Sequence, residues 1–548
     1  MPELVLGPLL RYVGDTEAVL WVETDEPCEV EVLGAREPTF CVGGHHYALV
    51  CAAGLEPGTW HEYEVLLDGN RVWPEPESGF PPSALRTYPK DGPLQLVFGS
   101  CRVAAPHEPP HSLRKDQHER GREVDALHTM ALRMRDEPRE RWPDVLLMLG
   151  DQVYADEVPP ATAAFVESRR DPRKPPGRRV LDFEEYTRLY RESWSEPAIR
   201  WLLSTVSTAM IFDDHDVHDD WNISAAWRDG VRETEWWAEH IVGALQSYWV
   251  YQHLGNLPPA EHREDELLRR VTDAADGEPI LREFAERADR DVSGTRWSYA
   301  RDLGDTRLIV IDSRAGRVLE EGRRSMVDAD EWAWIEEHAT GDFDHLLLAT
   351  SLPWLLGEGM HHVEGWSEAV AGGAWGKAAS RVAERVRQTI DLEHWAAFQD
   401  SFAKLRDLQR AVAAGERGRP PASIVTLSGD VHHAYLFEVA YPRDAGVRSA
   451  VWQAVCSPYR NPLDARERRS IRLGMSRPFA VAARALARAA GVRDPDIRWR
   501  CVDGGPWFDN QVATLTIDGR RMRMHLEKAV PVDDHEARLE RVLDRELA

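Results

Sequence analysis

The stretch at residues 211–221, IFDDHDVHDDW, concentrates acidic and imidazole side chains that could bind metal ions. Seven of the eight residues from Asp213 to Asp220 are Asp or His. Ionised carboxylates packed this closely repel one another, and burying an unpaired one costs on the order of several kcal/mol. About two or three bound cations would neutralise the cluster, because such ions are often the largest local charges in a site. The stretch therefore predicts a metal centre.

Five apolar runs in the chain each end in a polar segment. The runs LQLVF, DVLLML, TAMIF, TRLIVI and SIVTL lead into GSCR (99–102), GDQVY (150–154), DDHD (213–216), DSR (312–314) and SGDVHH (428–433). In open α/β sheets, ligands bind beside the carboxyl ends of the strands. We therefore expect these five segments to meet at one site, although long stretches of chain separate them.

The side chains at these strand ends suit more than one metal. Carboxylates such as Asp151, Asp214 and Asp430 favour Ca²⁺, Mg²⁺ and Mn²⁺, whereas the imidazole of His432 and the thiol of Cys101 favour transition metals. Asp213 either binds an ion directly or orients its neighbours. The residue types alone therefore leave the identity of the metal ions open.

The elements that position these segments differ along the chain. Residues 1–92 carry short alternating strands separated by turns, which predicts a small β-sandwich of the immunoglobulin or fibronectin-III kind, with a Pro-rich linker at 74–92. Residues 93–530 alternate compact apolar runs with helical segments, which predicts an α/β catalytic domain. Residues 156–180 and 255–293 resemble loops or caps, residues 365–415 are mostly helical, and residues 531–548 are expected to form a C-terminal helical tail.

Composition narrows the possible functions. The chain has 548 residues, 43% hydrophobic and 29% charged, with a formal net charge of −26. This acidity disfavours nucleic acid and anionic membrane as partners, and no apolar run is long enough to span a membrane. No signal peptide or twin-Arg signal is visible, so we expect a cytoplasmic protein with reduced cysteines. No Walker A motif, dinucleotide loop or nucleophile elbow is present. The sequence indicates no oligomeric state.

The ordered set GSCR, LMLGDQVYADE, FDDHDVHDDW, IDSRAGR and SGDVHH resembles the PhoD-type alkaline phosphatases of the calcineurin-like metallophosphoesterase superfamily. The resemblance covers roughly residues 1–530, because that family also has an N-terminal β-sandwich. It implies an αββα core of two facing sheets between helices. It also implies hydrolysis of phosphate esters with Fe³⁺ and Ca²⁺ ions, with Mn²⁺, Zn²⁺ or Mg²⁺ as possible substitutes.

Three residues in the first two motifs carry the expected iron site. By the resemblance, Cys101 and Tyr154 match the ligands that favour ferric iron, as anionic thiolate and phenolate do. Asp151 matches the acidic residue that bridges metals across the superfamily. Taken alone, Cys101 would more often be a core residue and Tyr154 a packed aromatic; the motifs favour metal ligation.

The later motifs supply the remaining metal ligands and a catalytic group. Asp214 stands where simpler superfamily members have the Asn of Gly-Asn-His, and His215 stands at the catalytic His. Asp430 replaces the first His of Gly-His-x-His, and His432 keeps the second. The family often has Asn-Asn-Trp after this segment, so Asp219 is a departure and an additional possible ligand.

The predicted reaction follows from charge. A hydroxide held between metals would attack phosphorus in line, since metals lower the pKa of bound water from about 15.7 towards 7. His215 would protonate the leaving oxygen or stabilise its charge. Arg314 or Arg102 would hold phosphoryl oxygens, although Arg314 could equally neutralise the acidic site.

The predicted substrate is a phosphorylated small molecule, either a monoester or a diester. One alternative is a nuclease or a phospholipase-type diesterase that acts on a larger substrate at the same site. The other is a binding protein with a silent metal site.

Overall fold

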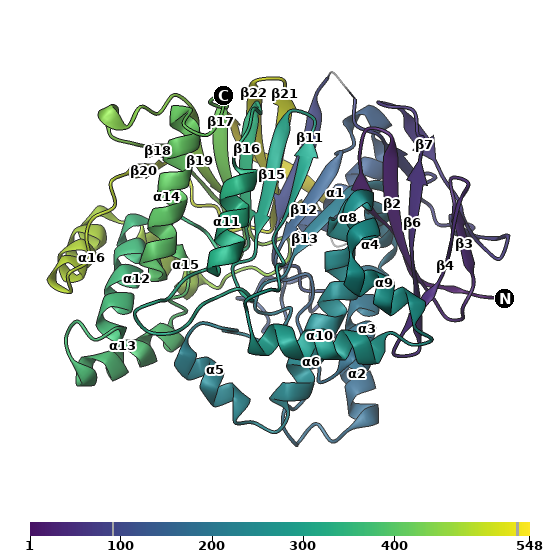
Figure 1. Ribbon diagram of the computed structural model, residues 1–548, viewed down its shortest axis with the longest axis horizontal. Helices are drawn as coiled ribbons and strands as arrows, with labels where there is room; N and C mark the ends of the chain where they lie inside the picture. Colours follow the sequence, from purple (N-terminus) through teal and green to yellow (C-terminus); the bar gives the residue numbers. More distant parts are fainter. Residues whose placement is uncertain (90–91, 503, 533–535) are drawn as a thin grey trace.

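Two central β-sheets in the computed structural model carry the predicted strand ends (Figure 1). The structure describes residues 1–89, 92–502, 504–532 and 536–548. One sheet has the order β13-β12-β11-β21-β22-β23 and the other β14-β15-β16-β17-β19-β18-β20. The first comprises β11 (Leu94–Gly99), β12 (Val145–Leu149), β13 (Ser207–Ile211), β21 (Gln511–Asp518), β22 (Arg521–Pro531) and β23 (Ala537–Glu546). The second comprises β14 (Tyr299–Leu303), β15 (Thr306–Ile311), β16 (His345–Thr350), β17 (Ser423–Ser428), β18 (Tyr435–Ala440), β19 (Ala450–Val455) and β20 (Arg498–Cys501).

Alternating apolar side chains pack the two sheets face to face. Leu347 and Ala349 of β16 share one core cluster with Leu96 of β11, whereas Leu346 and Leu348 belong to a second cluster on the opposite face. This follows from the two-residue period of a strand. The helices α11 (Ala329–His338) and α14 (Gln399–Ala414) cover the outer face of the second sheet, and α1 (Ala126–Asp136) covers that of the first. The predicted αββα core is confirmed.

Parallel pairing brings the predicted strand ends to one edge. The strands β11, β12 and β13 run parallel, as do β15, β16, β17 and β19. All five predicted apolar runs are strands whose residues are almost entirely buried. Because the carboxyl ends of parallel strands lie at the same edge of a sheet, the polar segments that follow them converge.

The N-terminal domain forms a β-sandwich, as predicted. Its sheets have the orders β1-β2-β6-β5, β4-β3-β8-β9 and β10-β7. The strands are β1 (Leu4–Val13), β2 (Glu17–Thr24), β3 (Glu29–Val32), β4 (Ala35–Pro38), β5 (Phe40–Val42), β6 (His45–Ala53), β7 (Trp60–Glu62), β8 (Val65–Leu67), β9 (Asn70–Trp73) and β10 (Ala84–Arg86). The predicted linker 74–92 therefore contains a strand, and its residues 90–91 lie outside the described ranges.

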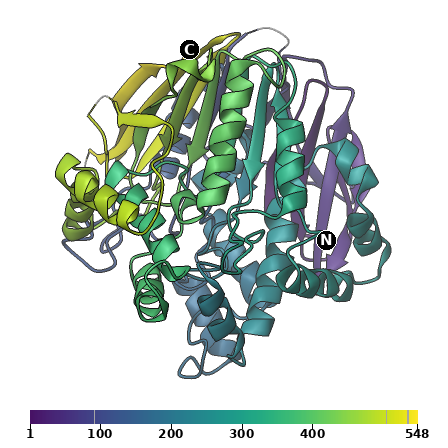
Figure 2. The ribbon, with the colours of Figure 1, turned by 60° about the vertical axis from the view of Figure 1, so that its left-hand side comes forward.

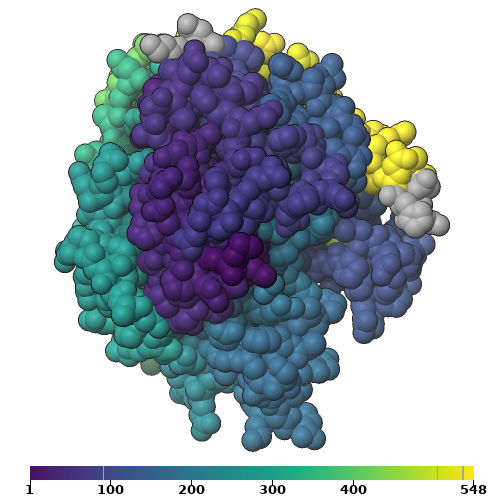
Figure 3. All heavy atoms as spheres, turned by 90° about the vertical axis from the view of Figure 1, so that its right-hand side faces the viewer, coloured from purple at the N-terminus to yellow at the C-terminus, as the bar shows by residue number. Residues whose placement is uncertain are grey.

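The N-terminal domain packs tightly against the catalytic domain (Figure 3). Arg11 of β1 is fully buried, and its guanidinium donates to the backbone carbonyl of Gln252 at 2.8 Å. The hydroxyl of Tyr63 donates to the carbonyl of Ser204 in the catalytic domain. Buried side chains that satisfy backbone carbonyls across an interface hold the two domains in one arrangement.

The predicted C-terminal helical tail, residues 531–548, is wrong. Outside residues 533–535, which the structure does not describe, this segment is mainly the strand β23, paired antiparallel with β22. Leu539 and Leu543 lie opposite Ala529 and Leu526. The four-residue spacing of these leucines matches one face of a helix, but a register shift between Leu526 and Glu527 places them opposite residues on different faces of β22. The hydrogen bonds that β22 offers along its edge decide for the strand.

Helices fill the long segments between the strands. The inserts predicted as loops or caps contain α2 (Pro160–Arg169) at 156–180, and α8 (Pro259–Glu264), α9 (Glu266–Asp273) and α10 (Glu278–Arg290) at 255–293. The predicted helical region 365–415 is confirmed by α12 (Glu358–Ala371), α13 (Lys377–Thr389) and α14. The other α-helices in the described residues are α3 (Phe183–Trp194), α4 (Pro197–Thr205), α5 (Ala225–Arg232), α6 (Trp237–Ser247), α7 (Leu254–Asn256), α15 (Ala465–Gly474) and α16 (Arg477–Ala489). Among the described residues, no helix is both long and apolar enough to cross a bilayer.

Candidate metal centre

Four strand ends meet around Asp151. The thiol Sγ of Cys101 lies 3.2 Å from Oδ2 of Asp151 and 3.5 Å from the backbone oxygen of Asp430. Cys101, Asp151 and His432 each offer a ligand atom within 4.8 Å of the others, and so do Asp151, Asp213 and Asp214. Asp151 belongs to both groups, which is the position of a ligand that two ions could share.

The backbone at these strand ends is strained. The φ angles of Cys101, Asp151, Asp430 and His432 are 56°, 49°, 64° and 51°. Residues other than glycine rarely adopt this left-handed region, and such strain clusters at functional sites. The surrounding core must hold these four residues in place against an unfavourable local conformation.

Two glycines allow the strand ends to approach so closely. A Cβ atom at Gly150 would lie 2.6 Å from the Cβ of Asp213, and one at Gly429 would lie 2.2 Å from the Oγ of Ser100. No side chain fits at either position without moving a neighbouring strand end. The Gly-Asp pairs at 150–151 and 429–430 therefore combine a close approach with a carboxylate.

Tyr154 points its hydroxyl at the same carboxylate. Its Oη donates to Oδ2 of Asp151 at 3.3 Å and accepts from the amide Nδ2 of Asn461 at 3.2 Å. Burial raises the pKa of Tyr154 well above its ordinary value, and the charge of Asp151 adds to this. Asn461 was not predicted, because it lies in a loop after β19 with no recognisable motif.

His215 lies between two carboxylates beside this centre. Its Nδ1 is 2.9 Å from Oδ1 of Asp156, and its Nε2 is 3.8 Å from Oδ1 of Asp219. Burial opposes protonation of His215, but Asp156 raises its pKa well above 6.5. A carboxylate beside each ring nitrogen favours the protonated form of the imidazole.

The two carboxylates beside His215 differ in how far the sequence indicates them. Asp156 was not predicted, although it lies within LMLGDQVYADE, two residues after Tyr154, where its spacing could have drawn attention. The side chain of Asp219 is 63% exposed and lies with Asp156 and His215, apart from the two groups that contain Asp151.

The carboxylates of the centre lack enough partners of their own. Burial raises the pKa of Asp214 to about 6, despite Arg314, and raises that of Asp151 well above its ordinary value with help from Asp214. Oδ1 of Asp151 and Oδ2 of Asp213 are buried without a hydrogen-bond partner. Buried polar atoms normally have a partner, so these oxygens fit cation ligands. The donor set therefore suits the implied metals.

The two predicted substrate-binding arginines are held elsewhere. Arg314 is fully buried, hydrogen-bonded to Asp213 and Glu393, and 3.1 Å from Oδ1 of Asp214. Arg102 donates to Asp125 at 2.9 Å and is 5% exposed. Neither guanidinium lines the cavity at the centre, which corrects the prediction that they hold phosphoryl oxygens. For Arg314 the geometry matches the alternative, which is neutralisation of the acidic site.

A chain of hydrogen bonds, which we name the relay, connects Asp430 through His394 to Glu364 in the helical region. Nδ1 of His394 is 2.6 Å from Oε1 of Glu364 in α12, and its Nε2 is 3.2 Å from Oδ2 of Asp430. Burial opposes ionisation of Asp430, but His394 lowers its pKa below the ordinary value. The sequence contains no signal for this relay, because its members come from a helix and a turn that only folding brings together.

A cavity of about 380 Å³ opens over the centre. Asp151, Asp214, His215 and His432 line it. Its apolar lining comes from the start of α12, from Ile390 and from α15 and its flanks: Leu356, Met360, Ile390, Leu463, Ile471 and Met475. The volume is typical of a site for a small molecule.

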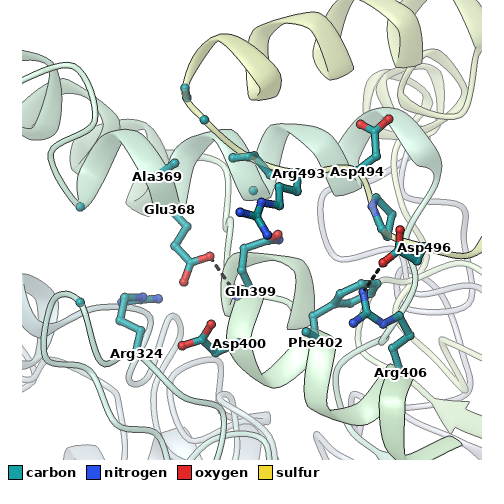
Figure 4. A pocket seen from close by; sticks show the side chains of 18 of the residues that line it. Arg324, Glu368, Ala369, Gln399, Asp400, Phe402, Arg406, Arg493, Asp494 and Asp496 are labelled. Atoms are coloured by element: carbon teal, nitrogen blue, oxygen red, sulfur yellow. Dashed lines mark hydrogen bonds and ion pairs between the residues drawn. The ribbon is translucent and has the colours of Figure 1, made fainter. Parts of the chain in front are cut away.

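A larger cavity of about 910 Å³ lies between α12, α14 and residues 490–496 (Figure 4). None of the predicted site residues lines it. Its Glu368 accepts a hydrogen bond from the backbone N–H of Gln399 at 2.9 Å, and its Arg324 rests on the ring of Phe398 at 4.3 Å. Cavity size therefore does not identify the chemical centre in this protein.

Comparison with known proteins agrees with this geometry. The family model described as PhoD-like phosphatase matches residues 128–503, which is more than half of the chain. The chain belongs to the PhoD-like phosphatase family. A second model, described as a domain of unknown function (DUF7800), matches residues 1–85 of this PhoD-like chain. The search of curated proteins returned no match.

Among solved structures, one described as the structure of PhoD superimposes with a TM-score of 0.60 at 12% identity, and the match covers 100% of this chain and 92% of that chain. At this identity the likeness shows the fold. A purple acid phosphatase from yellow lupin (Lupinus luteus) seeds matches with a TM-score of 0.48 at 12% identity, over 99% of this chain and 73% of that chain.

Proposed function

We propose that this PhoD-like protein hydrolyses phosphate esters at the cavity over Asp151, with metal ions as essential cofactors. The observation that carries the proposal is the convergence of four strand ends on Asp151, which leaves buried oxygens without protein partners. Membership of the PhoD-like phosphatase family supports the reaction class. The roles of individual residues in this chain are part of the proposal.

The proposed metal ligands form two groups, one for each kind of ion. Cys101 and Tyr154 both lie within 3.3 Å of Oδ2 of Asp151, and a thiolate and a phenolate beside one carboxylate suit Fe³⁺. The carboxylates of Asp214 and Asp430 suit Ca²⁺. In our proposal His432 belongs to the first group, with Cys101 and Asp151. Asp219 is a peripheral ligand at most, because it lies apart from Asp151.

When bound, these metals supply positive charge to the phosphoryl oxygens and lower the pKa of water. The chain itself supplies the acid. Asp156 holds Nδ1–H of His215, and His215 lines the cavity, so its Nε2–H would donate to the departing alkoxide. Burial of Asp151 and Asp214 keeps water from screening these charges.

The proposed substrate is a small phosphomonoester or phosphodiester whose organic group contacts the apolar lining. A cavity of about 380 Å³ whose lining includes Leu356, Met360 and Met475 as well as acidic residues favours an organic group with apolar character. A nuclease or phospholipase-type reaction on a larger diester remains the alternative activity of the same centre.

The proposal is tested by elemental analysis of the purified protein together with a panel of p-nitrophenyl phosphate, bis-p-nitrophenyl phosphate and DNA. We expect bound iron and calcium and hydrolysis of at least one chromogenic ester. A fully metal-loaded protein without activity on any of these substrates would contradict the proposal in favour of a silent binding protein. Cys101→Ser should remove a visible thiolate–iron absorption band, and a colourless wild-type protein loaded with Zn²⁺ or Mn²⁺ would overturn the ferric assignment.

A further inference from the structure

The helices α15 and α16 form a strongly basic surface element in an acidic protein. Residues 465–489, which we name the basic hairpin, contain seven arginines and a single acidic residue, Glu467, whereas the whole chain has a net charge of −26. Figure 1 shows α16 as the outermost element on the left, and in Figure 2 the hairpin lies on the outer surface. Charge is therefore segregated to one end of the molecule.

The exposed face of α16 is unusually apolar. Its inner residues Ala480, Ala483 and Ala487 are buried, and the helix packs on α12. On the outer side, where a surface helix normally carries polar residues, Val481 is 69% exposed and Leu486 39% exposed. The other positions on this outer side include small residues. The helix therefore presents an apolar surface to its surroundings.

Other apolar side chains extend this surface. Leu473, near the end of α15, is 59% exposed. Trp375 is 43% exposed, and its indole N–H donates to the backbone oxygen of Ala489 at the end of α16, at 3.2 Å. An exposed tryptophan beside an amphipathic helix is typical of elements that lie at a lipid interface.

Several arginines of the hairpin form no ion pair with the acidic side chains that the structure describes. Arg484 and Arg488 pair with Asp494, and Arg468 lies 3.5 Å from Glu123. In the described part of the chain, no ion pair engages the guanidiniums of Arg466, Arg469 and Arg477. These three charges are available to an anionic surface.

We propose that the basic hairpin docks the protein on an anionic lipid bilayer. Arginines beside exposed apolar side chains match a surface that combines anionic headgroups with an acyl layer. The acidic remainder of the molecule is repelled by the same surface, so only this end approaches. The expectation of no membrane partner rested on the net charge of the whole chain. Net charge does not show that the fold places basic residues together in one surface element.

Docking in this way places the catalytic cavity near the lipid. The opposite side of α15 contributes Glu467 and Ile471 to the lining of the 380 Å³ cavity. The hairpin thus has one face toward the cavity and another toward its surroundings. Membrane docking does not depend on the proposed hydrolysis, because vesicle binding is measured without turnover.

The experiment is sedimentation of the full-length protein with phosphatidylcholine vesicles, with and without about one third phosphatidylglycerol. We expect binding to the anionic vesicles alone, and its loss at about 1 M NaCl, where the Debye length is about 3 Å. Replacing Arg466, Arg469 and Arg477 by Gln should weaken binding by ~10²-fold, about fivefold for each Arg. Val481→Glu with Leu486→Glu should weaken it by at least ~10-fold.

Matched controls separate the hairpin from general surface effects. Arg443→Gln with Arg498→Gln removes two exposed arginines elsewhere, and Val532→Glu alters an apolar residue that is 52% exposed. Both should bind vesicles like the wild type, and all variants should keep the wild-type melting temperature.

Two outcomes overturn the proposal. One is a wild-type protein that does not sediment with anionic vesicles. The other is binding that requires the arginines but tolerates Val481→Glu with Leu486→Glu, and that a DNA oligonucleotide reproduces, since this pattern marks a surface for soluble polyanions.

Discussion

Two clusters of charged side chains in this protein differ in whether the chain itself supplies a partner for every carboxylate. At the interface between the domains, His45 lies between Glu23 at 3.1 Å and Glu184 at 2.8 Å, and the hydroxyl of Tyr251 donates to Glu23 at 3.0 Å. Each carboxylate there has a protein partner of suitable charge or a hydrogen-bond donor. The interface cluster is therefore complete within the chain.

The metal centre is incomplete in comparison. Asp151, Asp213 and Asp214 lie together and are buried, with Arg314 as the nearby guanidinium and with oxygens that no donor reaches. Buried ligand atoms without a hydrogen-bond partner therefore distinguish a site for an external ion from a cluster that only stabilises the fold. Acidity and cavity size distinguish the two less well.

The largest expected effect comes from Asp151. Asp151→Asn should lower kcat by about 10³-fold or more and reduce the metal content, because it removes the charge of the carboxylate that belongs to both ligand groups. Elemental analysis and turnover of p-nitrophenyl phosphate measure both effects. Glu23→Gln at the interface is the control and should retain metal and kcat; full metal content and full activity in Asp151→Asn would refute the shared-ligand role.

His215 should matter for turnover more than for metal binding. We expect His215→Ala to lower kcat by about 10²-fold while the metals stay bound, since proton transfer of this kind contributes 10²–10⁴-fold. The loss should be smaller for p-nitrophenyl phosphate than for an alkyl phosphate, whose leaving oxygen needs the proton more. Release of metal from the variant would show instead that His215 is a ligand.

The relay through His394 should have a moderate effect on metal affinity. His394→Ala frees the carboxylate of Asp430 and leaves Glu364 buried without its partner, so affinity should fall by about 10- to 10²-fold. Competition with a chelator measures this directly. His394→Gln retains a donor and should recover part of the affinity; equal affinity in the Ala variant and the wild type would exclude a positioning role.

The smallest expected effect is on stability at the interface. Burial opposes protonation of His45, but Glu184 and Glu23 raise its pKa from 6.5 to about 9. A folded pKa above the unfolded one stabilises the fold fully below about pH 6.5, and this contribution is lost as the pH rises towards 9. His45→Gln should therefore cost about 1–2 kcal/mol at pH 6 and much less at pH 9.5.

Denaturation curves of the wild type and the His45 variant at both pH values test this, with metal content as the control. Metal content should stay unchanged, because the interface cluster is separate from the centre. A destabilisation that is independent of pH would show that the lost contacts, rather than the charge of His45, stabilise the interface.

Local patterns predicted much of the fold and the centre. Apolar runs at 94–98, 144–149 and 423–427 predicted buried strands, because their length and composition leave few alternatives. The polar residues that follow these runs predicted that Cys101 and Asp151 are neighbours. The prediction of a helix at 531–548 is wrong, since its leucines are spaced four residues apart as in a helix, and only pairing with β22 makes the segment a strand.

The sequence by itself determined which residue types stand at the strand ends, and hence that cations are needed there, because both are properties of short contiguous segments. Only the tertiary structure decided which charges are already paired. Arg314 and Arg102 look available in the sequence but are held by Asp213, Glu393 and Asp125, whereas Asp156 and His394 join the centre without a motif. Electrostatic partners are chosen by distance and burial in three dimensions, which no spacing along the chain records.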